Sequence, residues 1–112
     1  MVNGSVSCVV PRSVTINNKK HLFIKLTWLD IVGSSSLCTD YEFGKLKCAT
    51  IITEAYLYEI FEDDGIECVR TFASYQNDDD IGYGDCNVYP MSVFTKSSQR
   101  AIRKAWKEMS KG

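Results

Sequence analysis

The sequence has little proline, a single histidine and no long apolar run. Its first residues lack the basic head and apolar stretch of a secretory signal, and no segment approaches the roughly eighteen consecutive apolar residues of a membrane-spanning helix. We therefore expect a cytoplasmic protein with no membrane partner. Apolar residues make up 45% of the chain and charged residues 24%, as in globular proteins and unlike disordered ones. The length predicts a single domain over residues 1–112.

Motifs for catalysis and for phosphate binding are also missing. There is no phosphate-cradling glycine-rich loop, and the stretch GSSSLC lacks the G-x-S-x-G pattern of serine hydrolases. A cysteine or serine nucleophile would need His21 nearby as its base, but His21 lies beside a polar turn, where we expect an exposed side chain. Neighbouring loop carboxylates such as Asp79 and Asp85 are usually solvated. We expect no enzyme activity and no cofactor.

The five cysteines do not form a metal-binding pattern. No C-x-x-C pair occurs, so a structural zinc site is poorly supported. A free thiol in an alternating apolar run packs as a small hydrophobic group, which is the setting of Cys8 and Cys68. We therefore expect buried, reduced thiols. The five are Cys8, Cys38, Cys48, Cys68 and Cys86.

Alternating apolar residues predict strands in the first third of the chain. The segment 5–10 places Val6, Cys8 and Val10 on one face, and two further apolar runs flank a polar turn at residues 17–20, as in a β-hairpin. Small polar residues at 33–40 predict a mobile loop after the second of these strands. The expected core face of that strand consists of Leu22, Ile24, Leu26 and Trp28.

The clearest local signal is a hairpin around Asp64-Gly65, two residues that tolerate the positive φ of a tight turn. Tyrosine, isoleucine and threonine before this turn favour a strand over the alternative helix at residues 49–62. A two-residue turn gives a register in which apolar side chains face apolar ones and the only charged pair is of opposite sign. The expected pairs are Phe61 with Cys68, Ile60 with Val69, Glu59 with Arg70, Tyr58 with Thr71, and Leu57 with Phe72.

The last part of the chain predicts an edge strand followed by an amphipathic helix. Pro90 cannot donate to a strand ladder and confines the strand CNVYPMSVF to an edge or a bulge. Ser97 is the expected N-cap of a helix of about three turns, with Trp106 as its largest apolar contact. Its apolar stripe is Ala101, Ile102, Ala105, Trp106 and Met109. The whole predicts an α+β fold, a small antiparallel sheet of four to six strands packed against this helix.

Charge is segregated along the chain although the total is only −1. Residues 1–50 carry six basic and three acidic groups, residues 51–85 carry one and ten, and residues 86–112 carry six and one. The hairpin gathers Glu62, Asp63, Asp64 and Glu67 at its tip. The loop QNDDDIGYGD, which starts near the other end of the same ribbon, adds further acids. We expect one acidic cluster at each end of the ribbon.

Our leading hypothesis is a small non-catalytic protein that binds a protein partner with a basic surface. Carboxylates spaced like phosphates would occlude the basic groove of a nucleic-acid-handling protein. Antirestriction and anti-CRISPR proteins of phages and mobile elements use this strategy, although no motif relates the chain to them. Tyr75 and Tyr83 are the expected aromatic contacts. The expected acidic contacts are Glu62, Asp63, Asp64, Asp78, Asp79, Asp80 and Asp85.

Two alternatives stay open beside a purely solubilising role for the charges. The basic face of the last helix could bind a nucleic-acid backbone, through Arg100, Arg103, Lys104 and Lys107; the pI of about 5.8 argues against it. The second alternative is a small cation-binding or structural domain. An EF-hand loop counted from Asp78 would need glycine at Tyr83 and glutamate at Tyr89, so we predict no metal site.

Overall fold

The computed structural model describes residues 12–111. The strand expected at residues 5–10, with Cys8, lies outside the described residues. The elements are β1 (Ser13–Ile16), β2 (Lys19–Asp30), α1 (Asp40–Phe43), β3 (Ala49–Asp63), β4 (Ile66–Phe72), β5 (Ser74–Asn77), β6 (Ile81–Gly84), β7 (Asn87–Pro90), the single turn η1 (Met91–Val93) and α2 (Lys96–Ser110).

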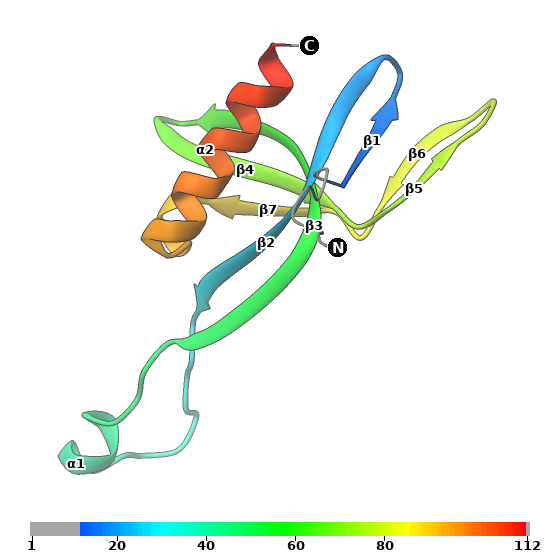
Figure 1. Ribbon diagram of the computed structural model, residues 1–112. Helices are drawn as coiled ribbons and strands as arrows, with labels where there is room; N and C mark the ends of the chain where they lie inside the picture. Colours follow the sequence, from blue (N-terminus) through cyan, green and yellow to red (C-terminus); the bar gives the residue numbers. More distant parts are fainter. Residues whose placement is uncertain (1–11, 112) are drawn as a thin grey trace, which may run out of the picture.

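The α+β fold is confirmed. Five antiparallel strands form one sheet in the order β1-β2-β3-β4-β7, while β5 and β6 form a separate two-stranded sheet. Figure 1 shows α2 lying across one face of the larger sheet. Pro90 ends β7, which is an edge strand as expected.

Both predicted hairpin turns are present and both use positive φ. Asn17 and Asn18, between β1 and β2, have φ of 54° and 65°. Asp64 and Gly65, between β3 and β4, have φ of 53° and 79°. Asparagine, aspartate and glycine are the residues that adopt this backbone at least cost, which is why the chain reverses at these places.

The register of β3 against β4 is as expected near the turn and differs beyond it. Glu59 faces Arg70, but Leu57 faces Thr71 instead of the predicted Phe72, because a bulge at Tyr58 shifts the register. Because of the bulge, the side chains of Leu57 and Ile60 lie on the same face of the sheet. In a regular strand, residues three positions apart lie on opposite faces. As a result apolar Leu57, which is fully buried, enters the core beneath α2 in place of Tyr58.

Each face of the sheet carries its own hydrophobic cluster. The cluster beneath α2 includes Leu22, Leu26 and Ile102, with Ile24 and Trp28 packed against it, so the predicted core face of β2 is confirmed. On the opposite face, Ile16, Tyr56 and Phe72 form a smaller cluster with Phe23, Tyr58 and Tyr83 around it. This second cluster is mostly aromatic and holds the base of the β5–β6 hairpin against the sheet.

Helix α2 begins earlier than expected but packs on the sheet through the predicted apolar stripe, with Ile102 and Ala105 in the core cluster and Trp106 and Met109 packed against it. Its N-cap is Thr95, whose hydroxyl accepts a hydrogen bond from the Ser98 backbone N–H at 3.3 Å; the predicted cap, Ser97, is already inside the helix. The helix therefore has about four turns and not three. Ile102 is fully buried whereas Trp106 is only partly buried, so Ile102 is the central contact with the sheet.

The prediction of buried thiols is wrong for three of the four described cysteines. Cys68 is buried, but Cys38, Cys48 and Cys86 are exposed and all four are unpaired. Cys38 and Cys48 lie on the segment that joins β2 to β3, which has no core of its own, and Cys86 lies in the turn before β7.

Two segments extend away from the body of the fold (Figure 1). The predicted loop after β2 ends in the short helix α1, where Thr39 and Glu42 form a reciprocal capping box. Asp78 to Asp80 form a loop, as expected, but the flanking residues 74–77 and 81–84 pair as β5 and β6 and make it the tip of a hairpin. These extensions give a radius of gyration of 18.0 Å, against about 13 Å for a compact domain of this length.

Candidate functional site

The first predicted acidic cluster occupies the turn between β3 and β4. Glu62, Asp63 and Asp64 are exposed there. No ion pair involves any of the three among residues 12–111. Because the tight turn projects these side chains beyond the sheet, their charge faces solvent and is available to a partner.

The second cluster occupies the tip of the β5–β6 hairpin. Asp78, Asp79 and Asp80 are exposed, and within the described part of the chain they too have no cationic partner. The Asp78 carboxylate accepts hydrogen bonds from the Gln76 side-chain amide at 2.9 Å and from the Asp80 backbone N–H at 3.0 Å. These bonds, the one from Gln76 first, lower the pKa of Asp78. The tip therefore keeps Asp78 charged to a lower pH than an ordinary aspartate.

Asp85 lies at the base of this hairpin and not at its tip. It has a φ of 53°, and its carboxylate accepts a hydrogen bond from the Ser74 hydroxyl at 3.1 Å. Tyr75 and Tyr83 pair across the two strands and both pack against Phe72, with ring centroids 6.3 Å and 5.0 Å away. Burial and neighbouring Tyr58 raise the pKa of Tyr83. Tyr83 thus fixes the hairpin to the sheet, while Tyr75, 43% exposed, is the tyrosine a partner could contact.

The two acidic tips lie on opposite sides of the molecule. In Figure 1 the turn between β3 and β4 and the tip of β5–β6 point away from each other, with the sheet between them. The structure therefore joins residues 62–64 into one cluster and residues 78–80 into another, and leaves Asp85 apart from both. A single partner could contact both tips only by spanning the sheet.

The basic residues proposed for α2 are exposed on its solvent side. Arg103 forms a forked ion pair with Glu67, with N–O distances of 2.7 Å and 2.9 Å. This contact lowers the pKa of Glu67 and raises that of Arg103. Arg100, Lys104 and Lys107 form no ion pair with any residue of the described range. The helix therefore neutralises Glu67, beside the first tip, but not the acids of either tip.

His21 is the residue that sequence reasoning placed wrongly. It is 1% exposed instead of solvated, because β2 alternation turns it toward the aromatic cluster, where its ring stacks on Tyr58 with centroids 5.5 Å apart. Its Nδ1 lies 3.0 Å from the Leu57 carbonyl oxygen, so Nδ1 carries the hydrogen and donates it. Its Nε2 is then a buried acceptor, and no described residue donates to it. Burial is the main cause that lowers the pKa of His21.

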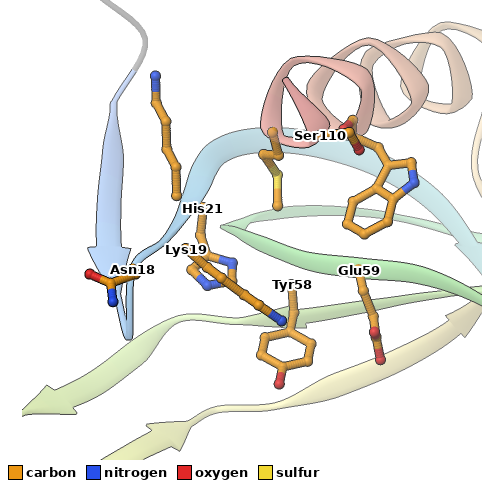
Figure 2. A pocket seen from close by; sticks show the side chains of 9 residues that line it. Asn18, Lys19, His21, Tyr58, Glu59 and Ser110 are labelled. Carbon is orange, nitrogen blue, oxygen red and sulfur yellow. The ribbon is translucent and has the colours of Figure 1, made fainter. Parts of the chain in front are cut away.

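A pocket of about 250 Å³ opens where β2 and β3 diverge beyond their last pair, Phe23 with Tyr56. Figure 2 shows Lys19, His21 and Tyr58 around it, beneath the C-terminal end of α2. Its lining mixes lysine, carboxylate and aromatic groups. None of the three exposed cysteines lines this pocket; Cys86 lines a second pocket, of about 160 Å³, that shares Tyr58 with the first.

Within residues 12–111 no group of three or more histidine, cysteine, aspartate or glutamate side chains is arranged to hold a metal ion. In the same range, no helix has both the length and the apolar character that crossing a membrane requires. No protein-family model, curated protein or solved structure matches the chain.

Proposed function

We propose that the chain is a non-catalytic inhibitor or binding protein whose acidic tips occupy the basic groove of a nucleic-acid-handling protein. The observation that carries the proposal is the exposure of six carboxylates on two projecting turns, none with a cationic partner in the described range. The six are Glu62, Asp63, Asp64, Asp78, Asp79 and Asp80.

The mechanism is steric and electrostatic. A groove that binds a phosphate backbone holds lysine and arginine side chains and therefore has a positive potential. A tight turn carrying three adjacent carboxylates enters such a groove as a compact anion and competes with the phosphates for those side chains. Tyr75, exposed at the base of β5–β6, adds an aromatic contact of the kind that often dominates interfaces.

The arrangement of α2 favours partner binding through the acidic tips over direct binding of nucleic acid by the helix. Arg103, central to the basic face, is already committed to Glu67 through two hydrogen bonds. A phosphate would have to compete with that carboxylate. The acids of the tips face no such competition within the described residues.

The test is a competition assay with purified proteins and fluorescein-labelled duplex DNA. A panel of restriction endonucleases and CRISPR effector nucleases is bound to the DNA, and the chain is added at increasing concentration. We expect displacement of DNA from at least one enzyme. We expect the displacement to be abolished in a variant that combines Glu62→Gln, Asp63→Asn, Asp64→Asn, Asp78→Asn, Asp79→Asn and Asp80→Asn. Asparagine tolerates the positive φ at position 64, so the turn is retained.

A control variant neutralises three acids elsewhere, with Asp30→Asn, Glu54→Gln and Glu108→Gln, and it should still displace DNA. Its direct match is the variant of one tip alone, Asp78→Asn, Asp79→Asn and Asp80→Asn, which also removes three carboxylates. Direct binding of the wild-type chain to the enzyme, measured without DNA, should weaken as the salt concentration is raised, because salt screens the attraction between the acidic tips and the groove. Equal displacement by the six-site variant and the wild type would contradict the proposal. Binding of the chain itself to the DNA would favour α2 as the functional surface.

A further inference from the structure

The segment from residue 29 to residue 52, which we call the arm, is rich in exposed apolar side chains. It comprises the end of β2, the loop with α1 and the start of β3, and it extends from the body of the molecule (Figure 1). Leu37 is fully exposed and Ile31 is 89% exposed. The exposed apolar residues of the arm are Leu29, Ile31, Val32, Leu37, Tyr41, Phe43, Leu46 and Ile52.

The arm gathers many exposed large apolar side chains on one projecting segment. Taking roughly 150–250 Å² for a large side chain, the eight residues expose on the order of 1,000 Å². Monomeric proteins rarely expose a contiguous apolar patch of more than a few hundred Å². A stable interface buries about 800 Å² on each partner. The summed exposed area of these side chains is therefore comparable to the area that one side of a stable interface buries.

The charges of the arm indicate that it binds a different kind of surface from the basic partner proposed for the acidic tips. The arm carries three acidic residues, Asp30, Asp40 and Glu42, and two basic ones, Lys45 and Lys47. The ammonium group of Lys45 lies 4.2 Å from the centre of the Tyr41 ring, which holds it against the apolar surface. A nearly neutral surface with both signs close together does not attract a strongly basic groove. It complements a surface of the same composition.

We propose that the arm binds the arm of a second copy of this chain. In a two-fold symmetric dimer every contact occurs twice: if residue i of one copy contacts residue j of the other, then residue j of the first copy contacts residue i of the second. Antiparallel arms then place the acidic end of α1 in one copy near Lys45 and Lys47 of the other, while the apolar residues cover each other. The acidic tips, on the body of the fold, stay outside this interface, so the dimer would present them twice.

The mass of the full chain in solution tests the proposal, measured by light scattering and by sedimentation equilibrium. At about 100 µM, roughly a hundredfold above a micromolar Kd, we expect twice the chain mass of 12.7 kDa. The double variant Leu37→Asp, Phe43→Asp should fall to the monomer mass. Its circular dichroism should match the wild type, because neither side chain belongs to a core cluster. Its thermal unfolding should match the wild type only at concentrations low enough for the wild type to be monomeric, because dimerisation itself stabilises the folded chain.

The control is Ile66→Asp, which charges an apolar residue that is 55% exposed outside the arm and should stay dimeric. A wild type with the mass of one chain would overturn the proposal and assign the arm to a different protein. A double variant that remains dimeric would overturn it as well, because the interface would then lie elsewhere. The readout needs no partner with a basic groove, so its failure is distinct from failure of the proposed function.

Discussion

Replacing His21 by phenylalanine should remove a dependence of stability on pH that the wild type shows between about pH 5.5 and 7.5. In the folded chain the ring is neutral, donates from Nδ1 to the Leu57 carbonyl and leaves Nε2 buried without a donor. Protonation would place a charge in this aromatic environment, near Lys19. The folded state therefore resists a proton that the unfolded chain accepts near pH 6.5.

The sign and the size of the effect follow from this difference. Because the folded pKa lies below the unfolded value of 6.5, the stabilisation is present above that pH and is lost as the pH falls toward the folded pKa. One group can change the free energy of unfolding by at most about 1.4 kcal/mol per pH unit. Between about pH 7.5 and 5.5 the wild type should therefore lose up to about 1.4 kcal/mol through His21.

Urea unfolding followed by tryptophan fluorescence measures the free energy at each pH. At the upper end of the range, His21→Phe should differ little from the wild type. The substitution leaves the Leu57 carbonyl without its donor, which costs about 1–3 kcal/mol, but it also removes the unsatisfied Nε2 acceptor and so relieves a penalty of similar size. At lower pH the variant should not follow the wild-type decline. Tyr58→Phe, which keeps the imidazole, should follow it. An equal slope in His21→Phe and the wild type would show that the imidazole is not the source of the pH dependence.

Three further substitutions test the fold and the charge arrangement. Ile102→Ala should lower the free energy of unfolding in urea by about 2–5 kcal/mol, because the side chain is fully buried between α2 and the sheet; a loss below about 1 kcal/mol would contradict the packing. Gly65→Ala should cost about 1–2 kcal/mol in the same assay, since φ is +79° and the site is otherwise open; a stabilised variant would contradict this turn. Arg103→Ala should cost at most about 1 kcal/mol, because its pair with Glu67 is partly exposed. It should also strengthen competition with DNA by releasing one more carboxylate beside the first tip, and weaker competition would contradict the proposed role of the acids.

The parts of the fold that sequence reasoning predicted are those in which a local rule acts alone. Asp64-Gly65 specifies a turn through its backbone preference, and the apolar alternation of β2 specifies which face meets α2. The bulge at Tyr58 could not be predicted in the same way. It arises because Leu57 and Ile60 both belong beneath α2, and that requirement involves a helix about forty residues away in sequence.

The candidate site was predicted in composition but not in shape. The run from Asp78 to Asp80 is a loop, as aspartate predicts, but the strands on either side of it were missed. The pair of Tyr75 with Tyr83 and their packing on Phe72 stabilise those strands as a hairpin. His21 beside a polar turn gave no local sign of burial, which depends on Tyr58 and Phe72 from two other strands. The pair of Arg103 with Glu67 likewise depends on how α2 lies on the sheet.

Nuclear magnetic resonance of the isotope-labelled chain, mixed with an enzyme from which it displaces DNA, shows which surface meets the partner. We predict that the backbone amide resonances of residues 62–64 or 78–80 shift or broaden, and that the effect fades as salt is raised. Resonances of Arg100, Lys104 and Lys107 should stay unchanged. Perturbations confined to α2, with the resonances of both acidic tips unaffected, would contradict binding through the acidic tips.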